Sequence, residues 1–459
     1  MHPRLTRRML LLSSLVGAAL VGACALSPRD GSERPPIVFV HGNGDTAGLW
    51  ITTIWRFESN GWPRERLHAV DMPYPNARDD DSKPQDGRSS TAESRAYLAA
   101  EVDKVLAATG ARQVVLMGNS RGGYAIRNYV ANGGAAKVSH VVLGGVPNHG
   151  VWADSAYLPA NEFNGTGPFL MKLNAPQGPD GNEVTPGVRW LTVRSDNNDK
   201  FAQADGAWIG RKGLPTYVTS EGPALKGAQN VVLAGVDHRE TSFSAKAFDQ
   251  AWRFLTGTAP TTLDVVPEGR VVLDGKVSGI GVDNRQGTAA SNLPLAGATL
   301  EVYATDPATG ERSGAPALRK TIDAGGHWGP FVADAKVPYE FVISAPGYAT
   351  THIYRSPFPR SSNVVNLRAE RRADADKDAA AVVVLSRPRG YFGLPRDRIA
   401  LDGVSPPAGI PTGSAGVSTA KAKPDAAGRT VVGEFNGERL AGRAWPAADN
   451  HVVTLELTY

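Results

Sequence analysis

A serine at position 120 stands where an apolar run passes directly into a helix-like segment. Residues 114–117 form the apolar run, Gly-Asn-Ser-Arg-Gly occupies 118–122, and residues 124–131 continue with a helical pattern. A strand-to-helix turn this tight leaves little room for a side chain two residues before or after the serine, so both positions need a small residue. The pattern predicts that Ser120 lies at the carboxyl end of a strand, where a nucleophile is held. The alternative is an ordinary glycine turn, since the chain has 51 glycines.

Strand and helix patterns alternate around this turn. Five further apolar runs have the length of strands buried on both faces: 37–40, 67–70, 138–143, 188–193 and 231–233. Helical patterns lie at 90–109, ending at Gly110, and at 243–255. The alternation predicts a mostly parallel sheet with helices on both faces, spanning residues 34–257. In such a sheet functional groups lie at the carboxyl ends of the strands, as Ser120 does.

A serine nucleophile needs a base, and the base needs an acid that orients it. In a fold of this kind the order along the chain is serine, acid, histidine. His238 follows the run at 231–233 and immediately precedes the last helix, so it is the predicted base. The alternative is a capping or solvent-exposed histidine. His149 follows the strand after the serine and is predicted to be structural.

The acid is expected in the loop that follows the strand at 188–193. That loop contains Asp196 and Asp199. Asp199 is followed by Lys200 and the apolar Phe201. This fits a carboxylate that points inward while the residues after it pack against the protein. Asp196 fits a residue that caps the turn. The pattern favours Asp199, and Asp196 remains the alternative.

Acyl transfer also needs hydrogen-bond donors aimed at the oxyanion that develops. The sequence His-Gly-Asn-Gly at 41–44 directly follows the first strand, and its glycines let the backbone approach a substrate. The predicted donors are the backbone N–H groups of Asn43 and Arg121. His41 is predicted to be a structural residue of this loop.

These motifs resemble the small bacterial triacylglycerol lipases of class 2, of which the Bacillus lipase is the compact representative. The resemblance covers residues 36–150, including His-Gly at 41–42 and Gly-Trp at 61–62, and resumes at 235–238. Gly118 stands where that family often has alanine, and Asn119 where it usually has histidine; neither change removes a catalytic group. The resemblance implies a carboxylester hydrolase that works without a cofactor and without a metal ion.

Two insertions bear on substrate binding. Residues 73–89 are polar and acidic and lie where a lid would lie; the alternative is a disordered surface loop. Residues 152–187 carry enough apolar side chains to line an acyl pocket or to cover the sheet. Trp50, Trp55 and Trp62 have near-helical spacing and are predicted to be core residues.

The pattern changes to β beyond residue 262. Short alternating runs separated by glycine- and proline-rich turns predict a β-sandwich module at 263–369 and a second β module at 380–459, with the charged stretch 370–378 as their linker. The arrangement resembles an archaeal lipase whose C-terminal β region assists lipid binding. A structural spacer or an oligomer contact is the alternative, and the oligomeric state is left open.

The N-terminus has the form of an export signal. Residues 1–23 combine a basic start with an apolar stretch too short to span a membrane comfortably. Val-Gly-Ala-Cys at 21–24 resembles a bacterial lipobox, which predicts lipidation of Cys24 and a membrane anchor in the cell envelope. Thr-Arg-Arg at 6–8 also resembles a twin-arginine signal. The alternative is a cleaved secretory peptide in which Cys24 has no role.

Composition excludes several other classes of protein. The formal charge of +4 falls to +1 once residues 1–23, which hold three arginines and no acidic residue, are removed. Near-neutrality without a basic patch argues against a nucleic-acid partner. The single cysteine excludes a disulfide framework and a Cys-x-x-Cys metal or redox site.

Together these features predict an exported serine ester hydrolase that acts on acylglycerols, with activity falling below about pH 6–7 because the histidine must be neutral. A polyester such as a polyhydroxyalkanoate, or a polysaccharide ester, is the alternative substrate. A surface binding protein with a degenerate hydrolase core is the alternative of another class.

Overall fold

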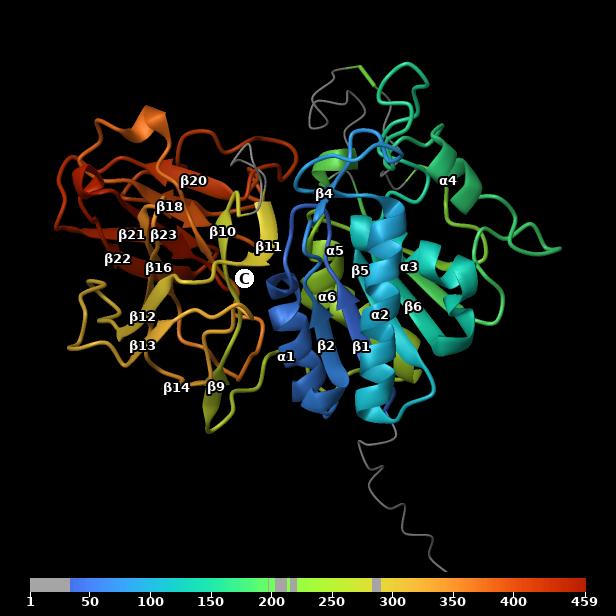
Figure 1. Cartoon of the computed structure of the whole chain (residues 1–459), viewed down its shortest axis with the longest axis horizontal. Helices are drawn as coiled ribbons and strands as arrows, with labels where there is room; N and C mark the ends of the chain where they lie inside the picture. Colours follow the sequence, from blue (N-terminus) through green and yellow to red (C-terminus); the bar gives the residue numbers. More distant parts are fainter. Residues whose placement is uncertain (1–33, 197, 203–212, 215–220, 283–289) are drawn as a thin grey trace, which may run out of the picture.

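The computed structural model describes residues 34–196, 198–202, 213–214, 221–282 and 290–459. The predicted signal peptide and Cys24 lie outside these residues. Figure 1 shows two regions side by side, an α/β region and a region made mostly of β-strands, with the C-terminus between them. Within the described residues, no helix has both the length and the apolar character needed to cross a bilayer.

The α/β region is built on a six-stranded sheet in the order β2-β1-β5-β6-β7-β8, and every pairing is parallel. The parallel sheet predicted from the alternating pattern is therefore confirmed. Three of its strands extend beyond their predicted carboxyl ends. The strands are β1 (Ile37–Val40), β2 (Leu67–Val70), β5 (Val114–Asn119), β6 (Val138–Gly144), β7 (Arg189–Ser195) and β8 (Gln229–Leu233).

Helices cover both faces of this sheet because its strands are apolar on both sides. Val38 and Val40 of β1 belong to a buried cluster that includes Ile126 of α3, whereas Phe39 belongs to a second cluster that includes Trp252 of α6. The helices are α1 (Ile51–Ser59), α2 (Thr91–Thr109), α3 (Arg121–Tyr129), α4 (Pro168–Leu173), α5 (Glu240–Phe243) and α6 (Ala245–Thr256).

The ends of α2 follow from its sequence. Ser90 is the N-cap and exchanges hydrogen bonds with Glu93 in a capping box. Gly110 ends the helix in the left-handed conformation at φ 65°. The helix and its C-terminal glycine were both expected from the pattern.

The second region contains a seven-stranded sheet in the order β13-β12-β15-β16-β23-β18-β20 and three smaller sheets. Its strands are β9 (Val271–Leu273), β10 (Val277–Ile280), β11 (Ala290–Pro294), β12 (Thr299–Ala304), β13 (Leu318–Thr321), β14 (Phe331–Ala333), β15 (Tyr339–Ser344), β16 (Thr350–Arg355), β17 (Leu367–Ala369), β18 (Val383–Ser386), β19 (Ile399–Leu401), β20 (Thr419–Ala422), β21 (Thr430–Phe435), β22 (Glu438–Arg443) and β23 (His451–Glu456). A β-rich region after the hydrolase domain is confirmed.

The two predicted modules of this region are joined through strand pairing. β23 pairs in parallel with β16 on one side and with β18 on the other, so segments 263–369 and 380–459 share one continuous sheet. Alternation of apolar and polar residues predicts strands but not which strands pair. One edge of β23 pairs with a strand of the first segment and the other edge with a strand of the second. Two hydrophobic clusters remain: Ile353 of β16 belongs to one and Tyr354, its neighbour, to the other.

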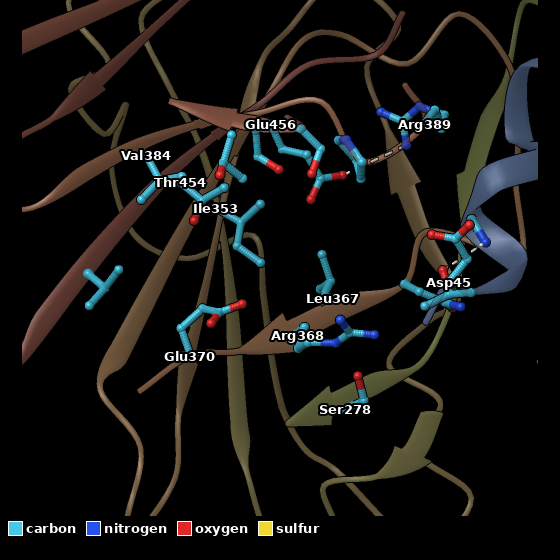
Figure 2. A pocket seen from close by; sticks show the side chains of 18 of the residues that line it. Asp45, Ser278, Ile353, Leu367, Arg368, Glu370, Val384, Arg389, Thr454 and Glu456 are labelled. Carbon is cyan, nitrogen blue, oxygen red and sulfur yellow. Dashed lines mark hydrogen bonds and ion pairs between the residues drawn. The ribbon is translucent and has the colours of Figure 1, made fainter. Parts of the chain in front are cut away.

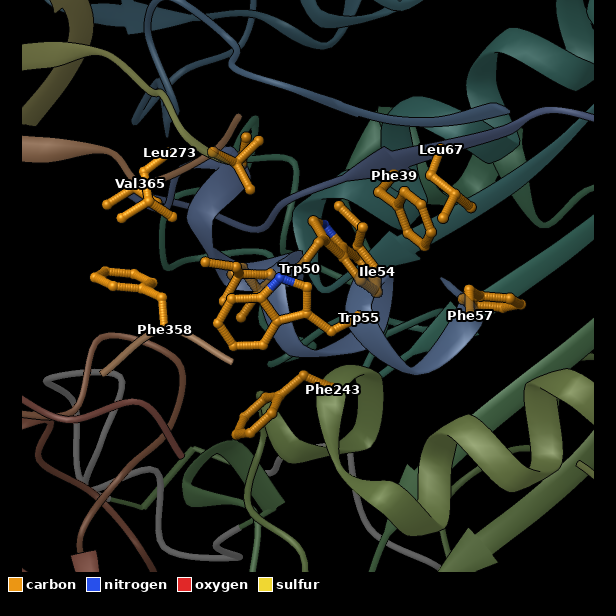
Figure 3. Packing of buried hydrophobic residues seen from close by; sticks show 14 of the residues in the cluster. Phe39, Trp50, Ile54, Trp55, Phe57, Leu67, Phe243, Leu273, Phe358 and Val365 are labelled. Atoms are coloured by element: carbon orange, nitrogen blue, oxygen red, sulfur yellow. The ribbon is translucent and has the colours of Figure 1, made fainter. Parts of the chain in front are cut away.

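The β region shares a hydrophobic core with the back of the hydrolase domain. Trp55 of α1 packs edge-on against Phe358 at 6.5 Å, and its indole N–H donates to Ser361 O at 2.9 Å. Figure 3 shows Trp55 between side chains of α1 and those of the β region, including Leu273 and Val365. The predicted core role of Trp55 is confirmed, and the same side chain also joins the two regions.

Candidate active site

Ser120 occupies the sharp turn between β5 and α3. Its backbone, at φ 50° and ψ −122°, lies outside the regions that a non-glycine residue ordinarily adopts. The flanking glycines allow this turn, since a Cβ on Gly122 would lie 2.5 Å from Val40 O and one on Gly118 would lie 2.6 Å from Ile126 Cδ1. The strained turn holds the serine at the carboxyl end of the central strand.

His238 lies in the loop between β8 and α5, as predicted. Its Nδ1 lies 2.7 Å from Asp199 Oδ2, and both side chains are buried. The edge of the Phe201 ring packs against the imidazole, with the ring centres 4.6 Å apart. The imidazole Nε2 is buried and has no hydrogen-bond partner within the described residues. Because a carboxylate can only accept from Nδ1, Nε2 is left as the acceptor of the ring.

Of the two candidate acids, Asp199 contacts the histidine and Asp196 does not. Asp196 instead accepts hydrogen bonds from the backbone N–H groups of Asn198, at 3.0 Å, and Gly235, at 2.9 Å. Asp196 therefore fixes the turn, which is the role predicted for it if Asp199 is the acid. Phe201 N donates to the second carboxylate oxygen of Asp199 at 2.8 Å.

Ser120 and His238 line one cavity of about 340 Å³. Most of its apolar lining comes from the segment after β6. Its polar lining includes Asn43, Lys200 and Tyr391. The full lining is Asn43, Asp45, Asn119, Ser120, Val151, Trp152, Tyr157, Leu158, Phe163, Lys200, Phe201, His238 and Tyr391.

The two predicted oxyanion donors lie next to this cavity. Arg121 is the first residue of α3, so its N–H is one of the helix amides that have no partner within the helix. Asn43 lines the cavity, and its side chain accepts from Ala77 N at 2.8 Å. Within the described residues neither backbone N–H donates to another protein group. A Cβ on Gly42 would lie 3.1 Å from Ser120 Cβ, so this loop packs directly on the serine turn.

The side chain of Arg121 has a second role that the sequence did not indicate. It forms a buried two-bond ion pair with Glu162, at 2.7 and 2.9 Å, and donates to Pro75 O and to Ser89 O. Burial raises the pKa of Glu162, against the effect of Arg121. One guanidinium therefore ties both insertions, 73–89 and 152–187, to the serine turn.

The insertion at 73–89 is an ordered segment and not the disordered loop that was the alternative. It is fixed by Arg121, and by Asp81, whose backbone N–H donates to Ala160 O and whose carboxylate accepts from Thr91. It contains the short parallel pair β3 (Asn76–Ala77) and β4 (Arg88–Ser89). None of its residues lines the 340 Å³ cavity. The apolar wall comes instead from the second insertion, through Trp152 and its neighbours, which is one of the two roles predicted for that segment.

Sequence reasoning missed Lys200 and Tyr391 as cavity residues. Tyr391 comes from the C-terminal β region, and its ring is flanked by Lys200 Nζ at 4.2 Å and by the Arg239 guanidinium at 4.6 Å. Burial lowers the pKa of Lys200 to about 8. No local pattern indicates Tyr391. Lys200 directly follows the predicted acid, and it was interpreted only as a packed neighbour of that acid.

The other two histidines near the site are structural, as predicted. His41 Nε2 accepts from Met72 N at 3.0 Å, and its Nδ1 lies 2.9 Å from Gly42 O. Burial lowers the pKa of His41. His149 contacts the Glu183 carboxylate at 3.0 Å and does not line the cavity.

A second cavity, of about 490 Å³, lies between the β strands and the hydrolase domain (Figure 2). It is lined by many charged side chains, including Arg368 of β17 and Glu456 of β23, and not by Ser120 or His238. Asp45, which pairs with Arg239, lines both cavities. Within the described residues there is no group of three or more His, Cys, Asp or Glu side chains arranged to hold a metal ion.

Two parts of the chain match family models. Residues 35–174 match the α/β hydrolase fold, and residues 269–372 match the lipase C-terminal domain. The two matches agree with the order of the parallel sheet and with the β-rich region that follows it. They do not distinguish class 2 lipases from others, so that resemblance, like the archaeal one, stays a prediction.

Similarity to solved structures is lower. Aspergillus fumigatus lipase B is 15% identical over 51% of this chain and 55% of that chain, with a TM-score of 0.37. Bacillus licheniformis lipase BlEst2 in its mature form is 21% identical over 46% and 86%, with a TM-score of 0.31. Phospholipase PlaB from Legionella pneumophila is 13% identical over 74% and 94%, with a TM-score of 0.35. The assignment therefore rests on the family matches: the chain has an α/β-hydrolase domain followed by a β-rich region that matches the C-terminal domain of lipases.

Proposed function

We propose that this chain is a serine carboxylester hydrolase of the lipase or esterase type. Ser120 is the nucleophile, His238 the base and Asp199 the acid that orients it. The observation that carries the proposal is the buried 2.7 Å contact between His238 Nδ1 and Asp199, beside the cavity that Ser120 also lines. The α/β hydrolase match over residues 35–174 supports the same chemistry.

In the first half of the reaction, Ser120 Oγ attacks the carbonyl carbon of the ester and its proton passes to His238 Nε2. Asp199 stabilises the imidazolium that forms. The oxyanion accepts hydrogen bonds from the N–H groups of Asn43 and Arg121, each worth about 10²-fold or more in kcat. When the intermediate collapses, the bond to the alcohol oxygen breaks and His238 returns the proton to that oxygen.

In the second half, water takes the place of the alcohol. His238 accepts a proton from the water as its oxygen attacks the acyl carbon of the acyl-serine. The second tetrahedral intermediate releases a carboxylic acid and regenerates the Ser120 hydroxyl, with the proton returned from His238. The net reaction is ester and water to acid and alcohol, and it requires no cofactor.

Acylglycerols are the proposed substrates. The apolar wall that contains Trp152, Leu158 and Phe163 suits an acyl chain, since burying each methylene of the chain contributes about 0.8 kcal/mol. The match of residues 269–372 to the lipase C-terminal domain supports a lipid ester over a polysaccharide ester. A polyester remains a candidate because its repeating unit is also an acyl ester of an alkyl alcohol.

The test compares wild type, Ser120→Ala and His149→Gln on p-nitrophenyl esters of two to sixteen carbons. We expect Ser120→Ala to lower kcat by about 10⁴-fold or more, since loss of the nucleophile removes the covalent route. His149→Gln is the matched control, because His149 contacts Glu183 outside the cavity, and it should retain activity. Turnover that does not depend on Ser120 contradicts the mechanism, and activity confined to the shortest esters contradicts a lipase.

We also propose that the protein is exported and anchored by a lipid on Cys24. The support is the signal-like segment at 1–23 and the lipobox-like residues that end at Cys24. Metabolic labelling with a radioactive fatty acid should label wild type but not Cys24→Ala, and the variant should move from the membrane to the soluble fraction. Equal labelling of both proteins contradicts the anchor.

A further inference from the structure

The loop that carries His238 is held by the C-terminal β region. Asp237, the residue before it, is fully buried, and each of its carboxylate oxygens accepts two hydrogen bonds. Oδ1 accepts from the backbone N–H groups of Arg239, at 2.8 Å, and Glu240, at 2.9 Å, and so caps the start of α5. Oδ2 accepts from Arg387 Nη1, at 2.7 Å, and from Tyr391 N, at 2.8 Å. One carboxylate therefore joins the histidine loop to a distant segment.

Charged side chains form a network of ion pairs around Asp237. Arg387 Nη2 lies 2.5 Å from Glu240 Oε1, and Arg396 Nη1 lies 2.8 Å from Glu240 Oε2. Burial opposes ionisation of Asp237, but Arg387 and Arg396 outweigh it and hold the pKa of this carboxyl below its usual range. Two guanidinium groups from the β region thus face two carboxylates from the histidine loop. Buried pairs of this kind add little net stability but fix geometry, because each bond is directional.

The acid loop is held by the same segment of the β region. Asp199 and Ala415 form an isolated parallel β-bridge, and Ala415 N donates to Asn198 O at 3.3 Å. Lys200 Nζ donates to Gly416 O at 3.3 Å. A Cβ on Gly393 would lie 2.6 Å from Ala415 Cα, so the two ends of this segment pack closely against each other.

We infer that residues 387–416 are a positioning element for the proposed His238–Asp199 pair and also form one wall of the substrate cavity. Arg387 and the Tyr391 amide hold the histidine loop, Ala415 holds the acid loop, and the Tyr391 ring lines the cavity. The hydrolase domain holds Ser120 in its turn, whereas the β region restrains the loops of His238 and Asp199. The β region therefore sets the distance of these two side chains from Ser120. The inference rests on the proposed function, and it concerns a segment outside both family matches.

The two roles predict different kinetic changes. Loss of the Arg387 contacts loosens the histidine loop, so kcat should fall by about 10- to 100-fold with KM unchanged, since misplacement by about 1 Å has effects of this size. Tyr391→Ala keeps the backbone N–H and removes the ring, so it should change KM and the preferred chain length with kcat retained.

The central test is Arg387→Met, with Arg439→Met as the matched control. Arg439 lies on β22 in the same region and makes an exposed contact with Glu434. Activity is expressed per active site titrated with a fluorophosphonate, so unfolded protein does not contribute. Arg387→Met leaves Asp237 and Glu240 with fewer partners and is expected to be less stable. The double variant Arg387→Met/Asp237→Asn removes that buried charge and should recover stability without recovering kcat.

A kcat that returns to the wild-type value in the double variant overturns the positioning role, because it assigns the whole effect to stability. Hydrogen–deuterium exchange of peptides within 234–244 gives an independent measurement. The positioning role predicts exchange at least about tenfold faster in both Arg387 variants than in Arg439→Met, and equal rates overturn it. If wild type has no Ser120-dependent turnover, the proposed function fails, whereas the exchange result still decides whether Arg387 restrains the loop.

Discussion

The two halves of the C-terminal β region contact the hydrolase domain in opposite ways. The half that matches the lipase C-terminal domain packs apolar side chains such as Phe358 against Trp55, and its buried Asn292 donates to Asp45 O at 2.9 Å. The second half, at 380–459, meets the histidine loop through ion pairs and backbone bonds, with Arg387 on Asp237. Both halves bury surface against the same domain, but within the described residues only the second of the two lines the cavity that Ser120 lines, through Tyr391.

This difference separates stability from geometry. Apolar burial is non-directional and roughly proportional to area, so the apolar contact of the first half holds the two regions together without setting any single distance. A buried ion pair costs desolvation and tolerates few geometries, so the second half fixes where a loop lies. The comparison predicts that changes in the first half alter the free energy of unfolding and that changes in the second half alter catalysis.

The largest effect on stability is expected for Trp55→Ala. Truncation of a fully buried tryptophan should lower the free energy of unfolding by about 3–5 kcal/mol, with kcat per titrated site unchanged. Urea titration followed by fluorescence measures the first quantity. Trp55→Phe is the control, because it loses the bond to Ser361 O but keeps most of the packing, and it should cost about 1 kcal/mol. A large loss of kcat in folded Trp55→Ala would break the comparison.

A similar loss is expected where a buried ion pair lies inside the hydrolase domain. Glu162→Gln leaves the Arg121 guanidinium buried without its carboxylate, which should cost about 3 kcal/mol. Since Arg121 also holds both insertions beside the serine turn, the variant should become sensitive to proteolysis within 73–89. Limited proteolysis with mass spectrometry locates the cleavage. Unchanged resistance to proteases would mean that the insertion is fixed without this pair.

A smaller effect is expected from Lys200, which packs on Tyr391 in the cavity. Because burial lowers its pKa to about 8, the side chain is charged at pH 7 and largely neutral at pH 9. KM for an ester with a carboxylate on its acyl chain should therefore rise by about fivefold between pH 7 and pH 9, since about 1 kcal/mol of attraction is lost. KM for the neutral methyl ester of the same acid should not follow this trend. In Lys200→Met, KM for the two esters should depend on pH in the same way. If KM for the charged ester still rises with pH in this variant, another group causes the rise.

The smallest effect is expected for Arg64→Met, at the edge of the apolar contact. Arg64 is 47% exposed and bridges Glu58 of α1 to Glu268 of the β region. Exposed ion pairs of this kind contribute about 0–1 kcal/mol, and salt screens them. The free energy of unfolding should therefore change by less than about 1 kcal/mol, and the change should vanish at high salt. A loss as large as that of Trp55→Ala would mean that ion pairs, and not apolar packing, hold the two regions together.

The sequence predicted the parts of the site that have local signals. Ser120 has a strained turn with flanking glycines, and His238 and Asp199 follow predicted strands in the expected order. Each of these depends on neighbours within a few residues in the chain. The fold of the hydrolase domain was predictable for the same reason, since apolar runs and helical periods are local patterns.

The remaining parts depend on contacts between distant segments. Arg387 is 150 residues from Asp237, and no pattern at either position indicates the other. The pairing of β16 with β23 likewise joins segments that composition separates, which is why the β region was divided in two. The guanidinium of Arg121 fixes an insertion that was expected to be a lid or a disordered loop, because polar composition predicts exposure but not which groups become paired.

The most direct measurement is covalent labelling of wild type with a fluorophosphonate, followed by intact mass and peptide mapping. The account predicts one adduct per chain, on Ser120, absent from Ser120→Ala. Relative to Arg439→Met, the adduct should form at least about 10²-fold more slowly in His238→Ala and about 10- to 100-fold more slowly in Arg387→Met/Asp237→Asn. No adduct on wild type, or an adduct on another residue, would contradict the proposed nucleophile. An adduct on Ser120 that forms at the same rate in all variants would contradict the role of the histidine loop and of the β region that holds it.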